Sequence, residues 1–294
     1  MGLPSLHSTP PITQVSSAMI HTGRAARSQD RTHPTHLACN EPPPMTTALV
    51  HIGVPKTGTT SFQDWIYRNR AQLLADRGVT LYDGFVPQIH RAQIHPELLL
   101  LSQRPERDCQ SKRMIPQWST QAWQQAARTH LADQVCSDAD TMLFTLEGLF
   151  LLRHEDEVER LAELLAPREV RVAVCLREPA SFLSSYRAQM AKNDVALSDD
   201  PTSHLHLEDG TWLTDWADML AVWRSVLGSS NVVELSYEQA MAEHGGTTQG
   251  ILEAFGIAPD GLPSMNSAVR NRSGNAHLNR IKRRVVKRVR RFVV

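Results

Sequence analysis

Short apolar runs rich in β-branched residues alternate with segments of helical periodicity from residue 48 to residue 255. Strands are predicted at residues 48–53, 79–82, 141–146, 170–176 and 231–235. Helices are predicted at residues 59–76, 119–135, 155–165, 179–192, 212–227 and 237–255. A chain that returns through a helix before each new strand builds a parallel sheet with helices on both faces, so the expected fold class is α/β. Residues 83–118 and 193–211 are predicted to be long connections, which in such domains usually serve as lids or substrate loops.

Composition divides the chain into three parts. Residues 1–45 contain seven of the 17 prolines, many Ser and Thr, and no apolar periodicity, so they are predicted to be a disordered leader. Met45 stands directly before the first strand, and one hypothesis is that translation starts there. Residues 46–265 are predicted to form one globular domain, and residues 266–294 a basic tail.

Positive charge is concentrated in the tail. Residues 270–294 contain ten Lys and Arg and no acid, whereas the preceding chain has 21 basic and 31 acidic residues. The apolar residues of the tail fall on one helical face, which predicts a basic amphipathic helix. They are Leu278, Ile281, Val285, Val286, Val289, Phe292 and Val293. We expect this helix to lie on an anionic membrane surface, with packing against the acidic body as the alternative. A nucleic-acid partner is not expected, because the rest of the chain is acidic and shows no recognition fold.

The cysteines and histidines indicate neither a disulfide framework nor a metal site. The four cysteines lie far apart and form no C-x-x-C motif, and no His has an acidic or Cys partner at ligand spacing. The chain contains no run of about 18 apolar residues, which is the length needed to span a bilayer. We therefore expect no metal and a cytoplasmic protein, bound peripherally at the inner membrane face if the tail is a membrane anchor.

A glycine-containing loop follows the first predicted strand and opens a helix, which is the geometry that aims unpaired backbone N–H groups at an anion. Gly53, Gly58 and Thr60 match the frame of the pattern G-x-x-x-x-G-K-[ST]. The lysine is displaced, because Thr59 occupies its usual position and Lys56 comes three residues earlier. A nucleoside triphosphatase needs that lysine beside the β- and γ-phosphates, with a neighbouring hydroxyl on magnesium. We expect a phosphate-like ligand that is bound without the usual metal.

The run Val54-Pro55-Lys56-Thr57-Gly58-Thr59-Thr60-Ser61 resembles the 5′-phosphosulfate loop of sulfotransferases that use 3′-phosphoadenosine 5′-phosphosulfate (PAPS). The form Pro-Lys-Thr-Gly-Thr-Thr is common in bacterial members. The resemblance implies that the loop's amides and hydroxyls hold the 5′-phosphate and that its lysine contacts the oxygen between phosphate and sulfate. The implied donor-binding residues of the loop are Pro55, Lys56, Thr57, Gly58, Thr59 and Thr60.

A second segment is similar to the 3′-phosphate motif of the same family. The predicted strand 170–176 is followed by Arg177, with Pro179 two residues later and Ser185 eight residues later. The resemblance implies that the Arg177 guanidinium and the Ser185 hydroxyl bind the 3′-phosphate. A weaker similarity covers residues 232–238 and the helix that follows, so the resemblance spans roughly residues 48–257. The segment Gly245–Gly250 lacks the lysine of the cytosolic branch's Gly-x-x-Gly-x-x-Lys segment and is expected to be a loop.

Sulfuryl transfer spreads charge over equatorial oxygens, so Lys56 is the expected catalytic cation. An acceptor hydroxyl or amine must also lose a proton, and two residues are candidates for the base. Glu147 follows the predicted strand 141–146, at the edge where α/β sheets bind ligands. His95, with His90 as a second choice, lies in the connection after the second strand. The alternatives are that Glu147 caps the following helix and that His95 is a solvated residue.

The function expected is transfer of a sulfuryl group from PAPS to a hydroxyl or amine of a saccharide, a lipid or a small metabolite. One alternative is a small-molecule kinase using ATP and magnesium, because residues 141–147 resemble a Walker B strand that ends in an acid. The displaced lysine disfavours that alternative. A second alternative is a non-catalytic, membrane-associated scaffold, which an intact set of Lys56, Arg177 and Ser185 disfavours.

Overall fold

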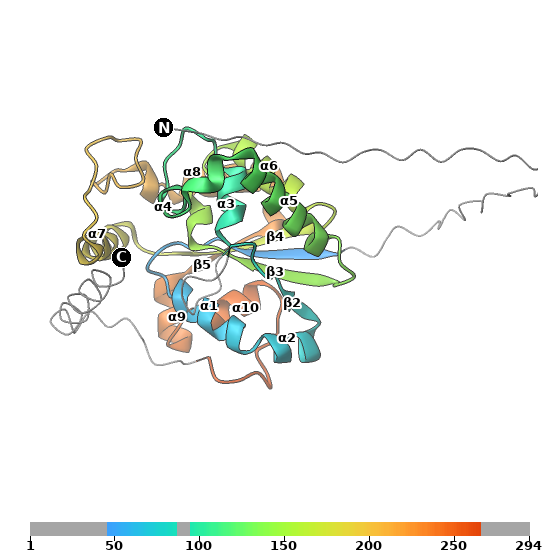
Figure 1. Ribbon diagram of the computed structural model, residues 1–294. Coiled ribbons are helices and arrows are strands. Elements are labelled where there is room, and N and C mark those ends of the chain that lie inside the picture. The colour runs from blue at the N-terminus through green and yellow to red at the C-terminus, as the bar shows by residue number, and fades with distance from the viewer. Residues whose placement is uncertain (1–45, 87–94, 266–294) are drawn as a thin grey trace, which may run out of the picture. The chain divides into compact units, whose positions relative to one another are not determined.

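The computed structural model describes residues 46–86 and 95–265 of the chain (Figure 1). The predicted leader, the predicted basic tail and residues 87–94, which include His90, lie outside the described residues. The strands are β1 (Thr47–His51), β2 (Val79–Leu81), β3 (Thr141–Thr145), β4 (Glu169–Leu176) and β5 (Val232–Ser236). The α-helices are α1 (Thr59–Arg68), α2 (Arg70–Arg77), α3 (Pro96–Ser102), α4 (Gln110–Met114), α5 (Gln121–Val135), α6 (Glu155–Leu165), α7 (Pro179–Asn193), α8 (Trp216–Leu227), α9 (Tyr237–His244) and α10 (Thr248–Ala254). Short 3-10 helices are η1 (Pro116–Ser119), η2 (Glu147–Leu151), η3 (Trp212–Thr214) and η4 (Ser229–Asn231).

The five strands of the described chain form one parallel sheet in the order β2-β3-β1-β4-β5. This confirms the expected α/β fold, with a parallel sheet flanked by helices. β1 is central, and Thr47 lies between Thr141 of β3 and Glu169 of β4. The chain passes to opposite sides of β1 as it builds the sheet, and open α/β sheets bind ligands at such a switch point, beyond the carboxyl ends of the strands. The loop after β1 occupies that position.

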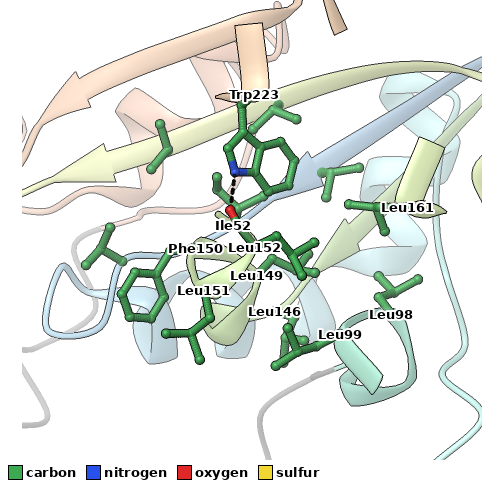
Figure 2. Close-up of a cluster of buried hydrophobic side chains, with 14 of the residues drawn as sticks. Ile52, Leu98, Leu99, Leu146, Leu149, Phe150, Leu151, Leu152, Leu161 and Trp223 are labelled. Carbon is green, nitrogen blue, oxygen red and sulfur yellow. Dashed lines mark hydrogen bonds between the residues drawn. The ribbon is translucent and has the colours of Figure 1, made fainter. Parts of the chain in front are cut away.

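Alternate side chains of the strands point into two layers of helices. In β1, Ala48 and Val50 are buried on the side that α3, α5, α6 and α8 cover (Figure 1). Leu49 points to the other side, which α1, α2 and α10 cover. Both faces are apolar because a parallel sheet with helices on each side has no solvent-facing surface. The fully buried indole of Trp223 in α8 lies in the first layer, and its Nε1 donates to the carbonyl oxygen of Leu152 at 3.1 Å (Figure 2).

The segment predicted as a long loop at residues 83–118 differs from expectation. It contains α3 and α4, and every residue of α3 from Pro96 to Ser102 is buried. A helix is recognised in a sequence by its alternation of apolar and polar faces, and burial on all sides removes that alternation. The four leucines at residues 98–101 therefore carry no helical period, although they form a helix in the core.

Two of the predicted helices are each divided in two. The helix expected at residues 59–76 is interrupted at Asn69, whose Nδ2 donates to the carbonyl oxygen of Trp65 at 2.8 Å. The helix expected at residues 237–255 is interrupted at Gly245, which ends α9 in the left-handed conformation typical of a helix C-terminus. The second interruption turns the chain so that Thr247 reaches the loop after β1.

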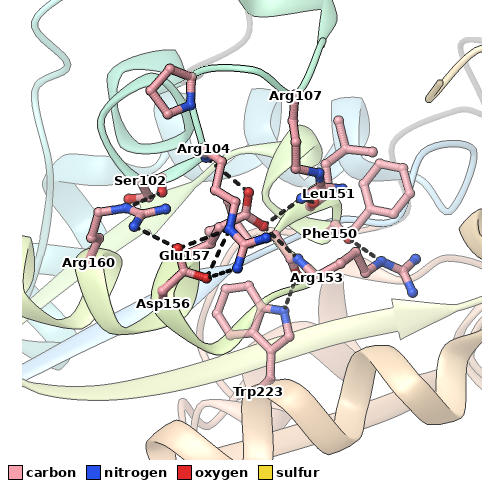
Figure 3. Close-up of polar contacts among 12 residues, drawn as sticks. Ser102, Arg104, Arg107, Phe150, Leu151, Arg153, Asp156, Glu157, Arg160 and Trp223 are labelled. Atoms are coloured by element: carbon pink, nitrogen blue, oxygen red, sulfur yellow. Dashed lines mark hydrogen bonds and ion pairs between the residues drawn. The ribbon is translucent and has the colours of Figure 1, made fainter. Parts of the chain in front are cut away.

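A buried carboxylate joins three segments on the α3–α6 side of the sheet (Figure 3). The side chain of Glu157 in α6 is fully buried and pairs with Arg107 at 2.5 Å. The same carboxylate accepts backbone N–H groups from Arg104 at 3.0 Å and from Arg153 at 2.9 Å. A buried ion pair is stable only where further hydrogen bonds satisfy its charges, and these amides supply them.

Arg153 extends this network toward the carboxyl edge of the sheet. Its guanidinium donates to the carbonyl oxygens of Leu213 at 3.0 Å and of Asp215 at 2.8 Å, and lies 5.3 Å from the ring centre of Trp212. Trp216, 5.9 Å from the same guanidinium, donates its Nε1 to the carbonyl oxygen of Arg177 at 2.9 Å. The backbone at the end of β4 is therefore linked to the buried network through one indole.

Replacing Glu157 by Ala should lower the free energy of unfolding by about 3–5 kcal/mol, because Arg107 would lose its carboxylate partner, and the amides of Arg104 and Arg153, the latter buried, would lose their acceptor. Urea unfolding followed by circular dichroism measures this change. Asp156→Ala is the matched control, since its carboxylate pairs with Arg104 and Arg160 but its side chain is 39% exposed. Exposed pairs contribute about 1 kcal/mol or less. Equal losses in the two variants would contradict the assignment of Glu157 as the centre of the network.

Candidate active site

The β1–α1 loop (residues 52–58) turns sharply where β1 ends. Gly53 has φ +100, and a Cβ at this position would lie 2.5 Å from the carbonyl oxygen of Glu147, so only glycine fits. Gly58 has φ +83 and Lys56 has φ +68. In the described residues only Lys56 and Asp194 combine a side chain with positive φ. Such conformations are uncommon outside glycine, and they concentrate at sites where function requires a particular backbone path.

Three successive N–H groups at the end of the loop have no partner among the described residues. The backbone N–H groups of Gly58, Thr59 and Thr60 donate to no carbonyl oxygen of the described chain. They lie at the N-terminus of α1, which has no acidic residue in its first turn and no side-chain cap. The positive end of the helix dipole and the unpaired donors together favour an anion at this position.

The carbonyl groups of the loop are bonded on its outer side. The Thr57 hydroxyl donates to the carbonyl oxygen of Val54 at 2.7 Å. Nη1 of Arg177, at the end of β4, donates to the carbonyl oxygen of Lys56 at 3.1 Å. The loop is thus held both by a hydrogen bond within itself and by the residue that follows β4.

Glu147 lies beside the loop as the first residue of η2, directly beyond β3. Its Oε2 accepts a hydrogen bond from the Thr59 hydroxyl. The carboxylate does not cap η2, which has no side-chain cap, so the alternative role as a helix cap is wrong. Burial raises the pKa of Glu147 above its ordinary value, while the bond from Thr59 and the charge of Lys56 oppose that shift. The last two effects come from residues of the loop and of the start of α1, so the acid interacts directly with this segment.

Lys56 is half-buried among charges of both signs. Burial lowers its pKa, the Glu147 carboxylate opposes this, and the positive charges of Lys192 and Arg177 lower the pKa further. A lysine beside two other cations is a favourable position for a ligand that carries several negative charges. The structure therefore brings Lys56, Glu147 and Arg177 together, as expected for residues at the carboxyl edge.

Arg177 is held on three sides. Its guanidinium lies 4.7 Å above the ring centre of Tyr237, its carbonyl oxygen is bound by Trp216, and its Nη1 is bound to the loop. Its Nε is buried and has no hydrogen-bond partner in the part of the chain that the structure describes. Ser185 is partly exposed on α7, and its hydroxyl makes no hydrogen bond to the described residues. Among the described residues, no hydrogen bond or ion pair joins Ser185 to Arg177 or to the loop, so their common role remains a prediction.

His95 lies in the interior, not at the surface of the site. It is fully buried, and its ring Nδ1 accepts the backbone N–H of Thr145 at 3.0 Å. The backbone N–H of His95 donates to the carbonyl oxygen of Thr145 at 3.2 Å. Burial lowers its pKa to about 3, so the ring is neutral. The alternative of a solvated histidine is wrong. No hydrogen bond among the described residues joins His95 to Lys56, Glu147 or Arg177, and its contacts are those of a residue that extends the pairing of β3.

Two residues that contact the site were not singled out by sequence reasoning. Tyr237 lies under the Arg177 guanidinium, and the resemblance of residues 232–238 to a late strand and helix start of sulfotransferases was the available signal. Thr247 donates to the carbonyl oxygen of Thr57 at 2.8 Å. No local signal indicated Thr247, because its partner lies 190 positions away in the chain.

The described part of the chain shows neither a metal-binding cluster nor a membrane-spanning helix. Over residues 46–86 and 95–265, no group of three or more His, Cys, Asp or Glu side chains is arranged to hold a metal ion. In the same ranges, none of the helices combines the length and apolarity that crossing a bilayer requires. Cys109, Cys136 and Cys175 are free thiols.

Comparison with known proteins identifies the family. A model described as "Sulfotransferase family" matches residues 49–260. Two solved structures are similar to the chain. A sulfotransferase from Alicyclobacillus acidocaldarius is 11% identical, with 75% of this chain and 85% of that chain covered and a TM-score of 0.49. The sulfotransferase domain from the curacin biosynthetic pathway is 12% identical, with coverages of 78% and 79% and a TM-score of 0.42. No functionally curated protein matches the sequence significantly. Because the family model spans most of the chain and includes both the β1–α1 loop and Arg177, the chain belongs to the sulfotransferase family.

Proposed function

We propose that this sulfotransferase uses PAPS as its donor and transfers the sulfuryl group to a hydroxyl or an amine. The observation that carries the proposal is the hydrogen bond between Arg177 Nη1 and the carbonyl oxygen of Lys56 at 3.1 Å. These residues lie 121 positions apart, and each belongs to a segment that resembles one of the two phosphate motifs of PAPS-dependent enzymes. Their contact supports a single binding site for a donor with two separated anionic groups.

The residues of the two segments fit such a donor. The free N–H groups of Gly58, Thr59 and Thr60 are suited to the 5′-phosphate, because they converge at the positive end of α1. The unpartnered Nε of Arg177 is suited to the 3′-phosphate, since a buried donor without a protein partner normally has one in the ligand-bound state. Ser185 is proposed to add a hydroxyl donor at the same phosphate, and Pro55 and Thr57 to complete the loop around the 5′ end.

Lys56 and Glu147 are proposed to carry the chemistry. A new bond forms between sulfur and the acceptor oxygen or nitrogen while the bond between sulfur and the bridging phosphate oxygen breaks. Lys56 neutralises the charge that grows on the leaving phosphate, and this kind of electrostatic stabilisation is usually the largest contribution to such catalysis. Glu147 receives the acceptor's proton, and the products are the sulfated acceptor and adenosine 3′,5′-bisphosphate.

We assign the base to Glu147 in preference to His95. Glu147 is hydrogen-bonded to Thr59 and lies within electrostatic reach of Lys56. A raised pKa makes an ionised carboxylate a stronger base, which suits proton abstraction near neutral pH. His95 is fully buried, its Nδ1 accepts a backbone N–H and its Nε2 has no partner among the described residues, so no hydrogen bond there links it to Lys56, Glu147 or the loop.

The acceptor class and the cellular location rest on sequence alone. A saccharide, a lipid and a small metabolite remain equivalent proposals. A cytoplasmic protein held at the inner membrane face by the basic tail is likewise a proposal, and the tail lies outside the described residues. Among the contacts of the described residues, none specifically favours the kinase or the scaffold, so no second function is proposed.

Lys56→Ala should lower the rate of transfer about 100- to 1,000-fold, because the leaving phosphate loses its cation. The assay uses the purified protein, radiolabelled PAPS, a native extract as source of acceptors and a metal chelator, and follows labelled product. Arg70→Ala, which removes an exposed positive charge on α2, is the control and should retain the wild-type rate. Absence of labelled product with the wild-type protein would overturn the proposed function, and unchanged turnover in Lys56→Ala the role of Lys56.

Arg177→Met should weaken the binding of adenosine 3′,5′-bisphosphate about tenfold to a hundredfold, as expected for the loss of charge-assisted hydrogen bonds. Arg177→Lys should recover little, because an ammonium cannot reproduce the planar fork of the guanidinium. Isothermal titration calorimetry measures both. Arg171→Met serves as the control, since Arg171 lies on β4, which Arg177 directly follows, but is exposed and paired with Glu169. If Arg177→Met and Arg171→Met bind equally well, Arg177 does not contact the donor.

The pH profile of kcat/KM should reflect the two shifted groups, because this ratio reports the pKa values of the free enzyme. Transfer needs ionised Glu147, whose pKa is raised, so activity should increase with pH through a midpoint above the ordinary value of about 4.3. It also needs charged Lys56, whose pKa is lowered, so activity should decrease through a midpoint below about 10.4. Glu147→Gln should reduce kcat about 100- to 10,000-fold and abolish the acid limb while leaving the alkaline limb. Persistence of the same acid limb in Glu147→Gln would rule out Glu147 as the base.

A further inference from the structure

Thr247 touches the β1–α1 loop from outside the site. It lies in the short connection between α9 and α10, and only 4% of its surface is exposed. Its Oγ1 donates to the carbonyl oxygen of Thr57 at 2.8 Å. Thr57 is itself fully buried, so this carbonyl has no water to replace the threonine as donor.

The Thr247 hydroxyl does not serve to stabilise α10. Thr247 occupies the N-cap position of α10, where a threonine hydroxyl ordinarily accepts a backbone N–H from the first turn. Here the side chain makes no capping hydrogen bond. The hydroxyl is turned toward the loop instead, and α10 begins without the cap that its sequence offers.

The bond to Thr57 determines where the next N–H group points. The peptide between Thr57 and Gly58 is trans, and a trans peptide directs its C=O and N–H groups to opposite sides. Because the carbonyl points at Thr247, the Gly58 N–H points away from α10. This N–H is one of the three donors at the start of α1 that lack a partner in the part of the chain that the structure describes.

The contact is also tight. A Cβ on Gly58 would lie 2.6 Å from Oγ1 of Thr247, closer than any side chain can approach. Gly58 has φ +83, a conformation that favours glycine independently of this contact. The hydroxyl therefore sits directly against the peptide that it holds, and leaves that peptide little room to rotate toward α10.

We propose that Thr247 is a positioning residue, which holds the Thr57–Gly58 peptide so that the Gly58 N–H faces the phosphate of the donor. The proposal rests on the function proposed above. Thr247 does not touch the donor in this arrangement. It acts through the loop, and its removal should weaken donor binding without changing the apparent affinity for the acceptor.

The test compares three variants that differ in one hydroxyl or one methyl group. Thr247→Val removes the donor at nearly constant volume, and Thr247→Ser retains it. Thr248→Val is the matched control, since Thr248 is 2% exposed but its hydroxyl makes no hydrogen bond within the described residues. Calorimetry with adenosine 3′,5′-bisphosphate should give a Kd about tenfold higher for Thr247→Val. Thr247→Ser and Thr248→Val should stay within about twofold of wild type.

Crystal structures of the wild type and Thr247→Val separate this proposal from the proposed function. Failure of the wild type to bind the bisphosphate would overturn the donor assignment, and the structures would still decide the role of Thr247. A rotated Thr57 carbonyl in the variant supports the proposal. The proposal is overturned if the Thr57 carbonyl keeps its orientation in Thr247→Val, or if this variant binds the bisphosphate with the Kd of the wild type. Thr247→Ala removes the same donor and replaces Thr247→Val if the valine variant does not fold.

Discussion

The outward-facing carbonyl groups of the β1–α1 loop are the contacts on which the candidate site depends. A short loop exposes free N–H groups toward a ligand only if something else binds its carbonyls, because each peptide directs the two groups to opposite sides. Arg177 binds the carbonyl of Lys56, and Thr247 that of Thr57. Both partners come from distant parts of the chain, which the sheet and α10 bring to the same edge. The orientation of the loop's backbone is in this sense a property of the whole domain.

The pKa values of the two charged groups at the site, Glu147 and Lys56, are both shifted toward the neutral form. Burial raises the pKa of Glu147 and lowers that of Lys56, so the interior disfavours both charged forms. Each group partly restores the other's charge, and the Thr59 hydroxyl adds to the stabilisation of the carboxylate. A site of this kind costs stability in the empty protein and is typical of positions that transfer a proton or bind an anion. The charge of Glu147 therefore depends on Lys56, and that of Lys56 on Glu147.

Support for Arg177 comes from two sources that are independent of the loop. Tyr237 lies against its guanidinium, and Trp216 binds its carbonyl oxygen. Trp216 in turn packs beside Arg153, whose backbone N–H is bound by the buried carboxylate of Glu157. The ion-pair network on the α3–α6 side therefore contributes to the site at a distance, by limiting where the end of β4 can lie. It also explains why this layer tolerates several buried arginines, since each has a carbonyl or carboxylate partner.

The strands, their parallel arrangement, the loop around Lys56 and the position of Arg177 were all predictable, because periodicity and short motifs are properties of a few neighbouring residues. The helix at residues 96–102 was not, because a helix buried on every side shows no polar face. The burial of His95 and the contact of Thr247 with the loop were equally hidden. They depend on segments separated by 50 and 190 positions, which only packing of the complete domain brings together. Sequence alone determined which groups could bind an anion, and the tertiary structure decided how their backbone is held, because hydrogen bonds between distant segments leave no local pattern.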